Sequence, residues 1–121
     1  NLKIKNFLIF PGSEAKLLKG LEKGSDGVIS ACVNSTHFLA RKVFDDFENK
    51  IPQTKNEQLI RVRETFDGYN LISALHSYHS IKDENYKNIL PPLTLLSEEK
   101  QKELIEKLNK LKFNNEKNLA A

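Results

Sequence analysis

The chain has 121 residues, 39% of them hydrophobic and 29% charged, so it is long enough for one domain with a modest core and too apolar to be disordered throughout. Its 19 Lys and Arg against 16 Asp and Glu leave a net charge of +3, but the lysines alternate with glutamates, which favours a solvated surface over a nucleic-acid-binding one. A single cysteine excludes an internal disulfide framework and suits a reducing compartment, and no apolar stretch approaches the roughly 20 residues that span a bilayer, so we expect a cytoplasmic protein that binds no membrane.

Residues 7–31 predict a β-strand, a helix and a second strand. The runs at 7–10 and 27–29 are wholly apolar and do not alternate with polar residues, which is typical of strands buried on both faces. Ser13 is placed to cap the helix between them, and the GSDG sequence at 24–27 ends it. A connection of this length predicts two parallel strands with a right-handed crossover inside a larger sheet, and hence an α/β fold.

No further strand is predicted in this chain. Everything after Ala31 has the pattern of helices, so the outer edges of the two strands would have no partner here. The sequence contains no Met and opens with the polar stretch NLKIKN. We therefore expect a fragment of a larger protein, the alternative being a processed mature terminus.

Helices are predicted along the rest of the chain. One begins at Ser35 or Thr36 as a cap and ends before Pro52. The next begins at Thr54, is interrupted at Asp67-Gly68 and continues to about residue 82, as two helices or as one kinked helix.

The last helix is predicted to follow an irregular stretch at 83–96, which Pro91-Pro92 holds extended. Ser97 caps this helix, and two glutamates in its first turn suit the helix dipole. The Lys- and Asn-rich residues 114–121 are expected to be a frayed tail.

The candidate binding residues follow the two predicted strands, because ligands of parallel sheets sit beyond the carboxyl ends of the strands. Glycine lets a ligand approach the main chain, serine donates or accepts, and a carboxylate can hold substrate hydroxyls. The alternatives are a plain helix cap at the first strand end and tight packing of small residues at the second. The candidates are Gly12, Ser13, Glu14, Ile29, Ser30 and Ala31.

No metal site and no catalytic residue is predicted within this chain. His76 and His79 lie three residues apart and His37 is a third imidazole, but no carboxylate or cysteine accompanies them at metal-ligand spacing. Cys32 has no base beside it in the sequence, so we expect it to be a small core residue.

Several motifs resemble the dihydrodipicolinate synthase and N-acetylneuraminate lyase family. Residues 7–34, FLIFPGSEAKLLKGLEKGSDGVISACVN, are similar to its seventh through eighth strands, with GSDGVIS matching a Gly-x-x-Gly-x-Ile-Ser segment and Asn34 a frequent asparagine. PPLTLLSEE at 91–99 resembles the lead-in to its final helix.

The resemblance implies the C-terminal part of a (β/α)8 TIM barrel. Residues 1–50 would be the last two βα units with strands 7 and 8, residues 51–113 a C-terminal helical region, and residues 114–121 the tail.

The resemblance also implies a class I aldolase or lyase, in which a lysine forms a Schiff base with pyruvate or another 2-keto acid, a tyrosine relays protons and no cofactor is needed. Both residues would lie before Asn1, so the chain alone is expected to be inactive. Its partners would be the keto acid, the missing N-terminal barrel portion and further copies in a homo-oligomer.

In the resemblance, Gly12 and the backbone of Ile29 would border the keto acid. Ser13, Glu14, Ser30 and Ala31 would meet the variable part of the substrate. Members that make dihydrodipicolinate usually carry Gly-Asp-Asp where this chain has Gly12-Ser13-Glu14. A 2-keto-3-deoxy sugar acid or a sialic-acid-type compound is therefore an alternative substrate.

Two functional hypotheses from other classes of protein stay open. The chain could be a free-standing helical module that binds a partner protein and has no catalytic role. A flavodoxin-like or response-regulator piece is a weaker alternative, because the acidic cluster it requires is absent from the sequence.

Overall fold

The computed structural model describes residues 4–113, and within them every regular element is a helix. The chain divides into two compact units after Leu59, and each is described by itself. The predicted boundary at residue 50 stays a prediction, and the tail at 114–121 lies outside the described residues. No helix in the described part of the chain is long and apolar enough to cross a membrane.

The predicted α/β fold, a TIM-barrel fragment with strands 7 and 8, is wrong for this structure, since neither residues 7–10 nor residues 27–29 form a strand. The two segments are extended and joined by main-chain hydrogen bonds from Asp26 N–H to the Ile9 oxygen (2.8 Å) and from Ile29 N–H to the Pro11 oxygen (3.2 Å). From the first bond to the second, the chain advances two residues on one segment, from Ile9 to Pro11, and three on the other, from Asp26 to Ile29. In a parallel ladder both strands advance by the same number of residues. Pro11 has no N–H to return the intervening bond, so the pairing does not become a sheet.

The apolar side chains of these segments lie at the surface of the first unit. Phe7 is 62% exposed, Leu8 63% and Ile29 69%, and Ile9 and Phe10 are also exposed. Burial of these side chains would need neighbours that the described residues do not supply.

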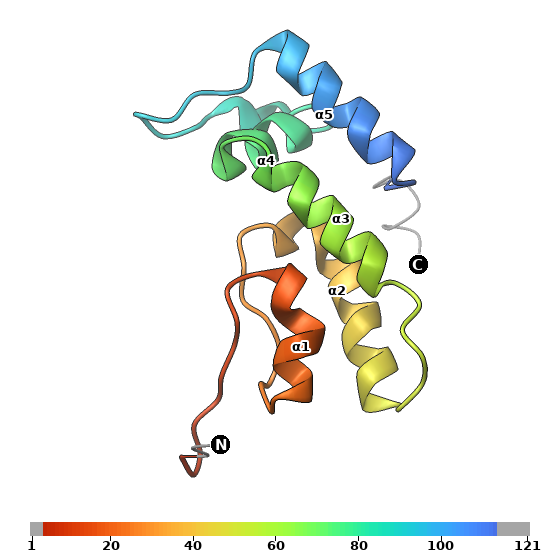
Figure 1. The fold of residues 1–121 in the computed structure, drawn as a ribbon. Helices are drawn as coiled ribbons and strands as arrows, with labels where there is room; N and C mark the ends of the chain where they lie inside the picture. Colours follow the sequence, from red (N-terminus) through yellow and green to blue (C-terminus); the bar gives the residue numbers. More distant parts are fainter. Residues whose placement is uncertain (1–3, 114–121) are drawn as a thin grey trace. The chain divides into compact units, whose positions relative to one another are not determined.

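The first unit is built on two helices that pack against each other, α1 (Leu17–Glu22), which follows the short 3₁₀ helix η1 (Glu14–Lys16), and α2 (Val33–Glu48) (Figure 1). Their contact buries apolar side chains spaced three or four residues apart. The buried apolar residues include Leu17, Leu21, Cys32, Leu39 and Val43.

The predicted caps of these helices are wrong. The side chain of Ser13 makes no capping hydrogen bond, although its carbonyl accepts from Lys16 N–H at 3.0 Å. Helix α2 begins at Val33, so Ser35 and Thr36 lie inside its first turn, where Thr36 Oγ1 donates to the Cys32 carbonyl (3.1 Å). A hydroxyl in the first turn can bond backward in this way instead of capping.

A buried carboxylate ties the end of α2 to the connection that follows. Asp46 accepts from Lys42 Nζ (2.6 Å), Thr54 Oγ1 (2.7 Å) and Thr54 N–H (3.0 Å). The hydrogen bond from Lys42 and then those from Thr54 lower the pKa of Asp46 below its ordinary value of 3.8. The break at Pro52 is confirmed, and α3 (Asn56–Asp67) begins after it.

The second unit contains α4 (Leu71–His79), the 3₁₀ helix η2 (Glu84–Lys87) and α5 (Glu98–Lys110), and α4 contacts both of the others. The interruption at Gly68 therefore separates two helices. The side chain of Asn70 caps α4 by accepting from Ser73 N–H (3.1 Å), which the sequence analysis missed. The predicted Ser97 cap of α5 is confirmed, with Lys100 N–H donating to Ser97 Oγ (3.3 Å).

Ser77 holds α4 to the start of α5. Its hydroxyl accepts from Leu96 N–H (2.9 Å), and its carbonyl accepts from the Gln101 side chain (2.7 Å). Ser77 is buried, so these bonds lie where water does not compete for them.

Candidate functional site

The predicted binding residues fall on two segments of the first unit, the loop leading into η1 together with its first residue, Glu14, and the loop leading into α2. The hydrogen bond from Ile29 N–H to the Pro11 carbonyl brings the loops side by side at the point where each carries its candidates. Residues sixteen positions apart in the sequence, Glu14 and Ser30, are thereby neighbours.

Glu14 forms the centre of this arrangement. Its side chain is fully buried. One carboxylate oxygen, Oε2, accepts from Ser30 Oγ at 3.0 Å, and the other, Oε1, lies 3.1 Å from Thr36 Oγ1, whose single proton it shares with the Cys32 carbonyl. A buried carboxylate is tolerated only where donors replace its lost water, and both hydroxyls do so here.

The second loop is held in place by its own hydrogen bonds. Ser30 Oγ also accepts from Cys32 N–H (3.3 Å), and the Asn34 side-chain amide donates to the Ala31 carbonyl (2.9 Å). The Ser30 hydroxyl therefore has a defined direction, because its proton is committed to Glu14 while its lone pair receives an N–H.

The remaining candidates face outward. Ile29 and Ala31 are exposed, and so is Gly12, where an added Cβ would meet no atom within 4 Å. Ser13 and Ser30 are half-buried. The structure thus divides the predicted residues into an accessible rim and a buried anchor, Glu14, which the sequence analysis had placed against the substrate.

Two residues of this site were missed from the sequence. Thr36 had been considered only as a helix cap, and nothing in the local sequence marks it as a partner of Glu14, 22 residues earlier. Asp26 was assigned to a turn, but its carboxylate accepts from Ile9 N–H (2.8 Å) while its own N–H donates to the Ile9 carbonyl (2.8 Å). The signal available in the sequence for Asp26 was its position directly before the apolar run at 27–29.

His76 and His79 serve as packing and hydrogen-bonding groups in the second unit. His76 Nδ1 lies 2.8 Å from the Tyr86 carbonyl oxygen, and the His79 ring stacks on Tyr86 with centroids 4.9 Å apart. Among residues 4–113, no three His, Cys, Asp or Glu side chains gather as a metal-binding group would.

Comparison with known proteins places these loops in a family context. The model of the dihydrodipicolinate synthetase family matches residues 2–111, which is nearly the whole chain and includes both loops. No curated protein and no solved structure matches the sequence.

Proposed function

Because the chain belongs to the dihydrodipicolinate synthetase family, and so is related to lyases, we propose that it takes part in Schiff-base chemistry on pyruvate or another 2-keto acid. In that reaction a lysine amine adds to the keto carbon, and water leaves to give an imine. A tyrosine relays the protons. We assign neither role to a residue of this chain and expect both groups to come from outside its 121 residues.

The chain's own part in this function is to shape the substrate pocket. The observation that supports it best is the hydrogen bond between Ser30 and Glu14, which joins the two loops that carry the predicted binding residues. Gly12 and the backbone of Ile29 border the keto acid, where the absence of a side chain at Gly12 leaves room for close approach.

The variable part of the substrate meets Ser13, Ser30 and Ala31. Glu14 is a positioning residue here, since it is fully buried and acts by directing the Ser30 hydroxyl. Hydroxyl groups along this rim suit a polar substrate chain. A 2-keto-3-deoxy sugar acid or a sialic-acid-type compound therefore stays beside the dihydrodipicolinate precursor as a candidate.

Trapping with borohydride tests the proposal. The purified chain is incubated with pyruvate and sodium borohydride, and its intact mass is measured. We expect no adduct on this chain alone, and one reduced pyruvate on a protein that carries this sequence together with the expected lysine and tyrosine. An adduct on any lysine of this chain, or none on the longer protein, contradicts the assignment.

A helical interaction module is the second candidate. Every regular element within residues 4–113 is a helix, which favours this candidate, whereas the exposed apolar side chains at residues 7–10 and Ile29 favour association with further copies or with the rest of an enzyme. Light scattering distinguishes the two functions. We expect concentration-dependent self-association for a lyase component, whereas a compact monomer over the whole concentration range would favour the module.

A further inference from the structure

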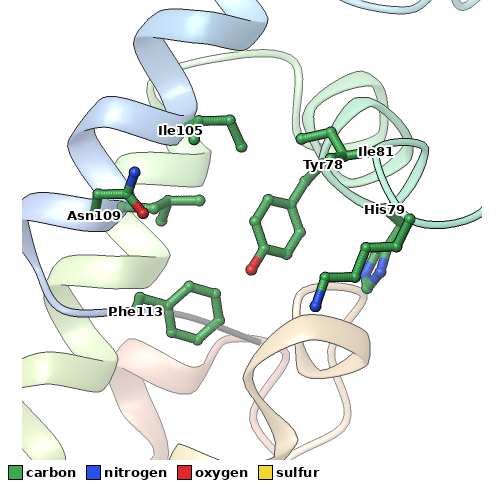
Figure 2. Close-up of a pocket in the computed structure, with 8 residues that line it drawn as sticks. Tyr78, His79, Ile81, Ile105, Asn109 and Phe113 are labelled. Carbon is green, nitrogen blue, oxygen red and sulfur yellow. The ribbon is translucent and has the colours of Figure 1, made fainter. Parts of the chain in front are cut away.

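The second unit contains a cavity of about 160 Å³ that the proposed function does not use. It lies between the end of α4 and α5, and Phe113, just after α5, forms part of its wall (Figure 2). The apolar lining residues are Ile81, Ile105, Leu108 and Phe113, with the ring of Tyr78. An apolar cavity of about 150 Å³ is large enough to bind benzene, so this one has room for a single six-membered ring.

The inner part of the cavity is apolar, and polar residues lie where it meets solvent. Leu108 and Phe113 are buried, with 1% and 2% of their surface exposed, whereas Asn109 and Lys82 are exposed although they also line the cavity. A ligand that reaches Leu108 and Phe113 leaves water behind, so a charge carried there would lose its hydration. This distribution favours a neutral, apolar ligand, because its transfer out of water is favourable in proportion to the apolar area that it buries.

Aromatic rings that contact one another make up one side of the wall. The Tyr78 ring lies edge-on to Phe66, with centroids 5.6 Å apart, and at a 32° tilt to Phe113, at 6.0 Å. The His79 ring meets Tyr78 edge-on at 5.4 Å and stacks on Tyr86 at 4.9 Å, so it belongs to the same cluster. Figure 2 shows the Tyr78 ring projecting between Phe113 and His79. A flat aromatic guest can make edge-to-face or offset contacts with such rings, which a saturated ring of similar size cannot.

We propose that this cavity binds a small, neutral aromatic molecule. The apolar side chains of the wall hold it by van der Waals contact, and the charge of Lys82 takes no part. The site is independent of the loops at Glu14 and Ser30, because all its lining residues belong to the second unit. Benzene is the simplest probe of this class, and cyclohexane is its saturated counterpart of similar size.

The test is an NMR titration of the ¹⁵N-labelled 121-residue chain with benzene. We expect saturable shifts at the amides of Tyr78, Ile105 and Phe113, and about fivefold weaker binding of cyclohexane, as the loss of one aromatic contact implies. Benzene should also raise the midpoint of urea unfolding, because a ligand that binds only the folded chain stabilises it. These two measurements use the unaltered chain, so they test the proposal whether or not a variant folds.

Ile105→Phe should fill the cavity and abolish the saturable binding of benzene. Ile72→Phe is the matched control, since it makes the same change in the second unit at an exposed isoleucine that does not line the cavity, and it should leave the affinity within twofold. Lys82→Gln should also leave the affinity within twofold, because the ligand carries no charge.

Three results would overturn the proposal. The first is the absence of saturable shifts, or of a rise in the urea midpoint, with benzene. The second is cyclohexane binding as tightly as benzene. The third is an equal effect of Ile105→Phe and Ile72→Phe, or a loss of benzene binding in Lys82→Gln.

Discussion

Removing either hydroxyl that donates to Glu14 should destabilise the first unit. Ser30→Ala deletes a donor 3.0 Å from a fully buried carboxylate and also an acceptor 3.3 Å from Cys32 N–H. A hydrogen bond to a charged group contributes about 1.5–3 kcal/mol and a neutral one about 0.5–1.5 kcal/mol. The expected loss in the free energy of unfolding is therefore about 2–4.5 kcal/mol.

Thr36→Val removes the other donor while keeping the shape of the side chain, and should cost about 1.5–3 kcal/mol. Both hydroxyls serve one carboxylate, so the double variant should depart from the sum of the single variants by at least about 0.5 kcal/mol. Urea unfolding followed by circular dichroism measures these differences.

Thr94→Val is the control for this series, because Thr94 is exposed and the same hydroxyl is lost there. It should change the free energy of unfolding by less than about 0.5 kcal/mol. If Ser30→Ala and Thr36→Val were as mild as Thr94→Val, the carboxylate would not depend on these hydroxyls, and Glu14 could not be what joins the two loops.

Three further predictions concern stability, each read from urea midpoints. Gly27→Ala should cost about 1–3 kcal/mol, because Gly27 has φ 157° and its Cβ would lie 3.3 Å from Phe10, whereas Gly12→Ala should be nearly neutral; equal costs would contradict this. The lowered pKa of Asp46 adds stability that is present above pH 3.8 and lost as the pH falls below it, so Asp46→Asn should flatten this acid dependence; an unchanged profile would oppose it. Ser97→Ala should cost about 1 kcal/mol, and no loss would argue against the cap.

The sequence predicted the helices of the second unit well because their signals are local. Ser97 is followed by two glutamates and a regular apolar stripe, and all of these act within a few residues. Gly68 likewise follows directly on the last residue of α3, Asp67. The Asn70 cap was missed, although an asparagine two residues after a glycine was a usable signal.

The candidate site was predicted only in part. The family relationship and the positions of the two loops followed from short motifs around Gly12 and Ser30. The burial of Glu14 did not, because its environment is made by hydroxyls 16 and 22 residues away. From the sequence alone, a carboxylate beside a glycine and a serine is explained equally well as a contact to a ligand and as a buried structural group.

What the sequence by itself determined is therefore the helical segments, their breaks and the family, since each depends on neighbouring residues or on the order of residues along the chain. The tertiary structure alone decided whether the apolar runs at 7–10 and 27–29 become strands. A strand exists only through hydrogen bonds to a partner, and Pro11 together with an uneven register leaves these two segments with too few of them.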